Sequence, residues 1–392
     1  MYKNGTSSRI ILISFCIISL PFLALSGDSS TLDLRFYGIP VITLISLSCL
    51  LVSLLFLNVS KIKISRKVIL SYLILLMYVI GTSFFASYPA SAISYLMYFT
   101  ICLASFYISK TIFQNTNIYS YLNTLKAVLF LILIAGILRF FYSSIDANIF
   151  VLVNRNATCL FLVLLAPLIT FLYESKYIKY SVYLSLNILL FINILLLFGR
   201  SAIIVLLVYY LSRNLNIRKA LLYSVPGLFL VLFYDIFLSD TLLSLQFLNL
   251  YDSALSLISG SYEDAPDEKR IILILSAWDI FVANPIFGVG LGLNNYLNSY
   301  DIHSTFIGQL DALRPHNFYL SLLVGSGVIG VLLHYFLFKN VFSDFLNHKI
   351  LKDSIYILMF MMLFNEYILF VPAWLILGIT ASMPSQNQSL RC

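Results

Sequence analysis

Arg155, Arg200 and His316 are the residues whose type and setting best suit chemistry. Arg155 lies in Asn154-Arg155-Asn156, and Arg200 lies between two apolar runs in Gly199-Arg200-Ser201. A guanidinium near hydrocarbon costs roughly 2.5–3.5 kcal/mol at mid-membrane and therefore usually faces a polar cavity. Its planar fork of donors matches phosphate oxygens. The two arginines predict an anion site, and the alternative for each is an interfacial arginine whose side chain reaches the lipid headgroups.

His316 is the histidine that best fits a general base. It lies in Arg314-Pro315-His316-Asn317, directly before an apolar run. A neutral imidazole, with a reference pKa of about 6.5, can accept a proton from a hydroxyl group. His303 has no comparable pattern around it, His334 lies within an apolar run, and His348 is expected in an inner loop.

Other site chemistries find little support in the sequence. The cysteines show no C-x-x-C spacing, and no His, Cys, Asp or Glu cluster has metal-ligand spacing, so we expect neither a metal nor a cofactor. Ser201 lacks a nucleophile elbow. The glycines of Gly288-Val-Gly290-Leu-Gly292 imitate a dinucleotide fingerprint without a βαβ unit around them, and we reject that interpretation.

The elements that must position these residues are membrane-spanning helices. Hydrophobic residues form 60% of the chain and charged residues only 10%, against roughly a quarter charged in soluble domains. The apolar runs are continuous, whereas barrel strands would alternate. We therefore predict an all-α polytopic membrane protein with about twelve transmembrane helices and one large loop containing short helices.

The predicted organisation is three segments. Residues 1–238 hold spans one to nine, residues 239–317 form the large loop, and residues 318–392 hold spans ten to twelve and a polar tail at Ser385–Ser389. The spans are expected near 10–25, 39–57, 68–86, 91–109, 124–142, 157–173, up to Phe198, up to Arg213, 220–238, 318–338, 354–370 and 371–381. Spans eleven and twelve meet at Val371-Pro372, where a single kinked helix is the alternative.

Charge sorting gives the orientation. The basic cluster at residues 61–67 predicts a cytoplasmic loop, which places both termini inside and the large loop outside. This sorting also accounts for the net charge of +7 without a nucleic-acid partner. All but seven of the 24 Lys and Arg then lie inside; the outward ones are Arg35, Arg139, Arg155, Arg200, Lys269, Arg270 and Arg314.

Several motifs together resemble the bacterial O-antigen ligases and the related O-antigen or exopolysaccharide polymerases. They are Lys269-Arg270-Ile271 through Trp278, Asn284-Pro285-Ile286-Phe287-Gly288-Val289-Gly290-Leu291-Gly292, His316-Asn317-Phe318-Tyr319-Leu320 and Gly327-Val328-Ile329-Gly330. Gly199–Ala202 and Asn154–Asn156 are similar to the family's two upstream arginine sites, so the resemblance covers about residues 150–335. In contrast, many members carry an acidic residue where this chain has Gly325.

The resemblance implies a GT-C-like fold and a metal-independent inverting glycosyltransferase of the bacterial inner membrane whose active site faces the periplasm. Its donor would be a glycan on undecaprenyl diphosphate. Arg155, Arg200 and Arg270 would hold the diphosphate, and His316 would take the acceptor's proton while Arg200 stabilises the leaving group. Asn317 and Arg314 would support His316.

The acceptor is left open by the sequence. We expect a ligase, with lipid A-core as acceptor, and the alternative is a polymerase that uses a second lipid-linked glycan. A lipid-glycan transporter or flippase would be a different class. Such proteins often carry internal repeats and midplane charges, and the sequence shows neither. A non-catalytic assembly partner is a further alternative.

Overall fold

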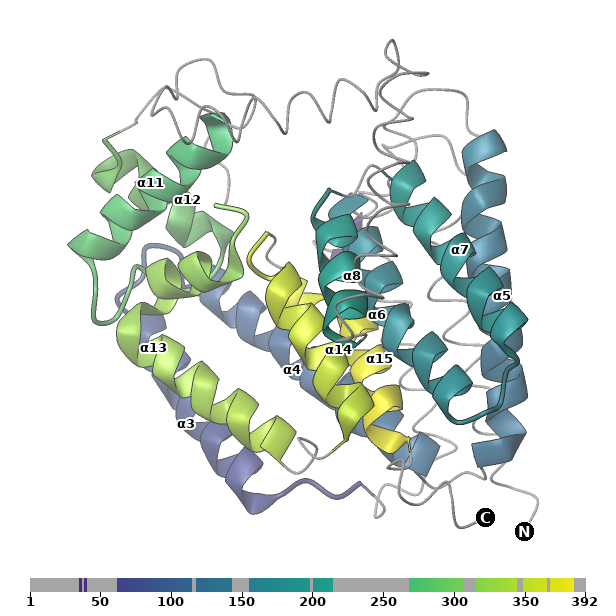
Figure 1. The fold of residues 1–392 in the computed structure, drawn as a ribbon. Coiled ribbons are helices and arrows are strands. Elements are labelled where there is room, and N and C mark those ends of the chain that lie inside the picture. Colours follow the sequence, from purple (N-terminus) through teal and green to yellow (C-terminus); the bar gives the residue numbers. More distant parts are fainter. Residues whose placement is uncertain are drawn as a thin grey trace. The chain divides into compact units, whose positions relative to one another are not determined.

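The computed structural model describes residues 35–36, 39–40, 62–114, 118–142, 155–197, 200–213, 268–305, 315–343, 348–364 and 367–383 (Figure 1). The predicted spans near 10–25 and 220–238, nearly all of the span near 39–57, Arg314 and the polar tail lie outside these residues.

The described chain is helical apart from one short strand pair. β1 (Arg35–Phe36) pairs antiparallel with β2 (Ile39–Pro40). The helices are α3 (Arg66–Ser83), α4 (Pro89–Gln114), α5 (Ile118–Tyr142), α6 (Arg155–Glu174), α7 (Tyr180–Leu196), α8 (Arg200–Arg213), α11 (Glu268–Ala283), α12 (Leu293–His303), α13 (Phe318–Phe342), α14 (Lys349–Met361) and α15 (Val371–Ser382), with a 3₁₀ turn, η4 (Tyr367–Leu369). The all-α prediction is therefore confirmed for this part of the chain.

Predicted spans three to eight and ten each coincide with a helix, α3 to α8 and α13. Spans eleven and twelve are separate helices, α14 and α15, and not one kinked helix; α14 ends at Met361, earlier than the predicted 370. Within the described ranges, α3, α4 and α13 are long and apolar enough to cross a membrane, and the other apolar helices are shorter. The total of twelve spans stays a prediction.

Helix ends follow ordinary capping chemistry. The Ser65 hydroxyl oxygen accepts from the Val68 N–H at 3.3 Å at the start of α3. Pro89 begins α4, where its missing N–H has no helical partner to lose.

Helix α3 exposes Leu70, Met77 and other apolar side chains along its length. An exposed apolar face on an apolar helix fits contact with lipid, so the chain is a membrane protein.

The helices fall into two compact units. Unit 1 comprises residues 1–77, 94–205 and 333–392, and unit 2 comprises residues 78–93 and 206–332. In unit 1, α6 is the central helix: residues 158–172 are all buried, and α7, α14 and α15 pack around it.

Trp374 of α15 fills an aromatic cluster in unit 1. Its ring is fully buried and contacts Phe99 and Phe106 of α4 and Phe338 and Phe342 of α13. Its indole N–H donates to the Ile368 carbonyl at 2.6 Å, which satisfies the polar atom of an otherwise apolar side chain.

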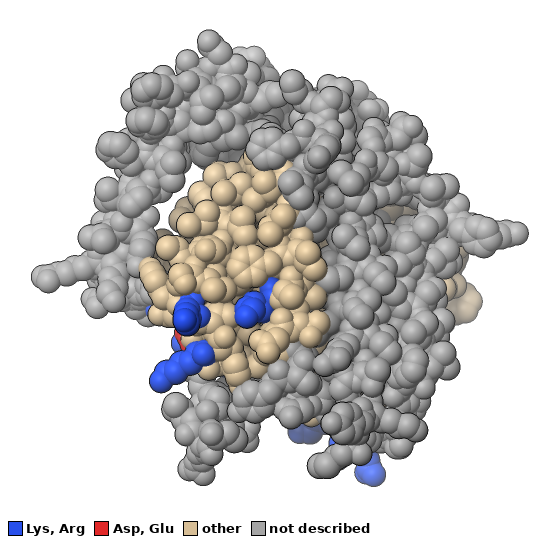
Figure 2. All heavy atoms as spheres, turned by 90° about the vertical axis from the view of Figure 1, so that its right-hand side faces the viewer, with Lys and Arg blue, Asp and Glu red and all other residues tan. Residues whose placement is uncertain are grey.

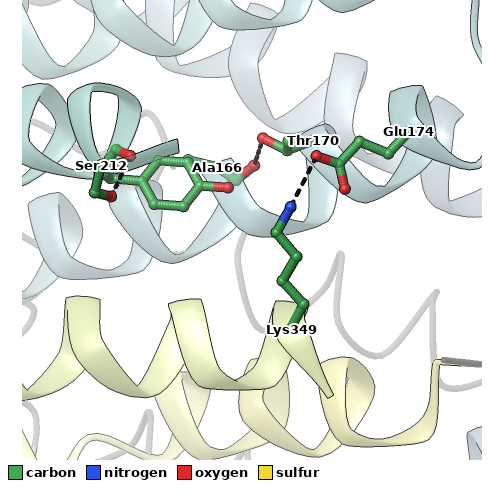
Figure 3. A network of polar contacts seen from close by, with 6 residues as sticks. Ala166, Thr170, Glu174, Ser212 and Lys349 are labelled. Atoms are coloured by element: carbon green, nitrogen blue, oxygen red, sulfur yellow. Dashed lines mark hydrogen bonds and ion pairs between the residues drawn. The ribbon is translucent and has the colours of Figure 1, made fainter. Parts of the chain in front are cut away.

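An ion pair links two helices of unit 1. Lys349, at the start of α14, lies 3.6 Å from Glu174, at the end of α6 (Figure 3). α7 carries no charged residue, and the described part of the face in Figure 2 is largely uncharged, with a few Lys and Arg side chains in its lower part. The ion pair joins two segments that charge sorting assigns to the same side of the membrane, although an exposed pair contributes only about 0–1 kcal/mol.

Unit 2 is built on α11, α12 and the first part of α13. Ala277 and Ile280 of α11, Tyr296 and Tyr300 of α12, and Val324 of α13 form its buried core. The turn between α3 and α4 also belongs to this unit. Within its described residues, the predicted loop therefore contains two helices, α11 and α12, packed on the N-terminal part of α13.

Candidate functional site

His316 lies at the start of α13 in an unusual backbone conformation. Its φ is 50°, in the left-handed region, which costs a non-glycine residue roughly 1–2 kcal/mol. The next residue caps the helix, because the Asn317 side-chain oxygen accepts from the Leu320 N–H at 3.1 Å. His316 is partly exposed and Pro315 is buried. Backbone strain of this kind is frequent at functional sites.

Two of the predicted anion-binding arginines begin helices. Arg155 is the first residue of α6 and Arg200 is the first residue of α8. The first N–H groups of a helix lack helical partners, and the helix dipole is positive there. Both positions therefore combine a basic residue type with a backbone suited to anions.

The predicted site residues divide between the two units. Arg155 and Arg200 belong to unit 1, whereas Arg270, in the first turn of α11, and His316 belong to unit 2. That these four residues share one pocket stays a prediction. Arg314 lies outside the described residues.

A glycine-rich loop runs beside a break in α13. Gly327 has φ 60° and ψ −172°, so the helix is interrupted there. In a continuous helix the N–H groups of Val328 and Ile329 would donate to the carbonyls of Val324 and Gly325. They donate instead to the carbonyls of Pro285 and Ile286, at 2.9 and 3.3 Å.

The freed carbonyls on the other side of the break are satisfied by the same loop. The Val289 N–H donates to Val324 at 2.9 Å, and the Gly290 N–H donates to Gly325 at 3.0 Å. The loop thus replaces two i→i−4 hydrogen bonds of α13 with four of its own. Since α13 is apolar enough to span a membrane, this pairing is what makes a broken backbone tolerable there.

Glycine is required on both sides of this contact. Gly288 has φ 69°, and a Cβ there would lie 2.5 Å from the Val324 carbonyl oxygen. A Cβ on Gly327 would collide with the Ile286 carbonyl. The motif that imitates a dinucleotide fingerprint therefore serves close packing of two backbones.

Tyr78 and Asn295 hold the same region and were missed by the sequence analysis. The Tyr78 hydroxyl, on α3, donates to the Ser326 carbonyl at 2.6 Å. The buried Asn295 side chain, on α12, accepts from the Tyr88 N–H at 2.7 Å and donates to the Tyr88 carbonyl at 3.1 Å. A tyrosine within an apolar run and an asparagine in a polar helix carry no spacing signal, so only the folded chain reveals these contacts.

The packing around Gly325 accounts for the glycine at a position where many family members carry an acidic residue. A Cβ at this position would lie 3.0 Å from a Leu291 methyl carbon and 3.3 Å from the Leu291 Cα. An acidic side chain would need Leu291 and its loop to move. The close packing of Gly325 against the glycine-rich loop therefore disfavours a larger side chain in this arrangement.

No group of three or more His, Cys, Asp or Glu side chains in the described ranges is arranged to hold a metal ion. The prediction of metal independence concerns the whole chain and stays a prediction.

The fold and these contacts define a helical membrane protein in which a glycine-rich loop is hydrogen-bonded to a broken helix. Residues 185–335 match the model of a family described as O-antigen ligase. The match confirms the resemblance to the O-antigen ligase and polymerase family over this stretch, which contains Arg200, Arg270 and His316. Arg155 precedes it. No curated protein matches the chain.

Proposed function

We propose that the protein transfers a glycan from a lipid diphosphate, of the undecaprenyl type, to a saccharide hydroxyl at the outer face of the bacterial inner membrane. The observation that carries this proposal is the family match, because it spans Arg200, Arg270 and His316 in one stretch. The exposed apolar faces of the helices supply the membrane setting in which a lipid-linked donor is available.

The arginines bind the donor diphosphate in this proposal. Arg155 and Arg200 each stand first in a helix, and the proposal has both guanidinium groups bind the one diphosphate. Arg270 assists from the first turn of α11. As the bond between the anomeric carbon and the diphosphate oxygen breaks, negative charge grows on the leaving group. Preorganised donors stabilise that charge in the transition state.

His316 acts as the general base. Its neutral imidazole nitrogen accepts the proton of the acceptor hydroxyl while the hydroxyl oxygen attacks the anomeric carbon from the face opposite the diphosphate, which inverts the configuration. The left-handed backbone supports this role, since a conformation that costs free energy is retained more readily where the side chain has a use. Asn317 caps α13 directly after His316 and supports His316 in this proposal.

A reconstituted transfer assay tests the proposal and identifies the acceptor. Purified protein in lipid vesicles is given a lipid-diphosphate glycan together with either lipid A-core or a second lipid-linked glycan. Transfer to lipid A-core, lost in His316→Asn, supports the ligase assignment. Lengthening of lipid-linked chains alone identifies a polymerase, and full activity of His316→Asn contradicts the base.

A control separates transfer from transport. Movement of the lipid-linked glycan from one leaflet to the other is measured in vesicles that contain the protein and no acceptor. Transport without transfer to either acceptor places the protein in the flippase class and overturns the proposal.

A further inference from the structure

Helix α11 is apolar on two opposite faces. One face packs in the core of unit 2, where Ala277 and Ile280 lie against Tyr296 and Tyr300 of α12. The resemblance to O-antigen ligases implies an amphipathic helix here, with a polar face opposite the buried one. The structure shows that the opposite face is not polar.

The outer face of α11 carries large exposed apolar side chains at one-turn spacing. Ile274, Trp278 and Val282 follow one another along the helix with Leu275 beside them, and Trp278 and Val282 are 53% and 59% exposed. Among the described side chains of this helix, Asp279 is the charged one, and its carboxylate accepts from the Thr305 hydroxyl at 2.8 Å. A water-facing helix would carry charges at these outer positions.

This outer face continues onto helices that are apolar enough to cross a membrane. Ile286 and Phe287 lie in the loop that follows α11, and Phe287 is 57% exposed. The Ile286 carbonyl accepts from Ile329 of α13, and the Phe287 carbonyl accepts from the Tyr78 hydroxyl of α3 at 3.3 Å. Beside these contacts Val328 of α13 is also exposed. The apolar surface of α11 is therefore continuous with surfaces that lipid covers in a membrane protein.

The dimensions and composition of α11 suit a helix that lies on a bilayer and does not cross it. Its 16 residues span roughly 24 Å, short of the roughly 20 residues that a transmembrane helix needs. Tryptophan favours the boundary between headgroups and acyl chains, because its ring is apolar and its N–H is polar. The helix also begins with Glu268-Lys269-Arg270, and basic residues are typical of interfacial helices.

We propose that α11 is an interfacial helix whose outer face, Ile274, Leu275, Trp278 and Val282, rests on the bilayer and holds unit 2 at the membrane surface. The occupant of this face is the lipid bilayer. The proposal needs the chain to be embedded in a membrane and does not depend on the glycosyl-transfer reaction.

Tryptophan quenching tests the proposal in the intact protein. The chain has two tryptophans, Trp278 and the fully buried Trp374, so the emission of wild type minus that of Trp278→Phe reports Trp278 alone. The protein is reconstituted in phosphatidylcholine vesicles with or without bromine at acyl positions 6 and 7. We expect brominated lipid to quench the Trp278 signal by at least half and aqueous acrylamide to quench it less.

The other results of this experiment contradict the proposal. Quenching by acrylamide and not by brominated lipid places Trp278 in water. Quenching by neither shows that protein, either another part of this chain or a partner, covers the face. Stronger quenching by bromine at positions 11 and 12 places the helix in the bilayer interior and not at its surface.

A second measurement leaves both tryptophans in place. Val282→Cys and Asp301→Cys, each in vesicles, are compared for their rate of reaction with a membrane-impermeant maleimide, after the reaction of the wild-type protein is subtracted. Asp301 is the reference position because it is exposed on α12. We expect Cys at position 301 to react at least tenfold faster than Cys at position 282. Equal rates overturn the proposal.

Discussion

The hydroxyl of Tyr78 lies 2.6 Å from the carbonyl oxygen of Ser326. This hydrogen bond satisfies a carbonyl next to the break in α13 from a helix far away in the sequence. Together with the four hydrogen bonds of the glycine-rich loop, it pairs backbone groups that the break in this apolar helix would otherwise leave unpaired. Each of the contacts at this break can be tested separately.

Removing the Tyr78 hydroxyl should destabilise unit 2. In Tyr78→Phe the Ser326 carbonyl loses its donor in a partly buried place, which costs about 1–2 kcal/mol. We expect a lower unfolding temperature in detergent and reduced transfer activity. Tyr72→Phe is the matched control on the same helix, because its hydroxyl pairs with Thr100 in an exposed position. An equal loss in both variants would contradict a special role for Tyr78.

Gly327→Ala should be severely destabilising. The positive φ and the collision of a Cβ with the Ile286 carbonyl both oppose an alanine, at a cost of about 1–3 kcal/mol for the backbone alone. Thermal unfolding and the yield of monodisperse protein measure the effect. Gly81→Ala is the control, since nothing lies within 4 Å of its Cβ, and alanine there should stabilise α3 by up to about 1 kcal/mol.

An acid at position 325 should not improve this protein. Gly325→Asp forces Leu291 and the glycine-rich loop to shift, whereas Gly325→Ala needs a movement of a few tenths of an ångström. We expect Asp to lower the unfolding temperature and the transfer rate more than Ala does. A gain of activity in Gly325→Asp would show that the loop adapts and that the family's carboxylate can act here.

His316→Asn should separate the chemistry from the backbone. Asparagine tolerates a left-handed φ, so the fold should persist, but it cannot accept the proton. We expect transfer to fall about 10²- to 10⁴-fold with the unfolding temperature nearly unchanged. His316→Ala should lose the same activity, and its free energy of unfolding should also fall by about 1 kcal/mol. His303→Asn, on the exposed end of α12, should retain full activity.

Arg200→Lys should weaken transfer although the charge is kept. A lysine cannot present two parallel donors to a diphosphate, so kcat/KM should fall about 10- to 100-fold. Arg213→Lys is the control at the other end of α8. Its guanidinium lies over the Tyr209 ring, 5.6 Å from the centroid. Equal kinetics of Arg200→Lys and wild type would remove Arg200 from the diphosphate site.

The sequence by itself determined the helical class, most helix positions and the family stretch. Apolar runs of spanning length allow little besides helices in lipid, so the predicted starts near 68, 91 and 318 fall close to those of α3, α4 and α13. The apolar run that begins after Asn317 also marked the start of α13 correctly.

Only the tertiary structure decided what the glycines, Tyr78 and the outer face of α11 do. The Gly288–Gly292 pattern has no meaning until the broken helix lies against it, since the hydrogen bonds it makes replace those of residues far along the chain. Likewise, the resemblance implied an amphipathic helix at α11, whereas two of its faces are apolar. Which of them is buried and which is exposed depends on where α12 packs, and periodicity alone cannot supply that when both faces are apolar.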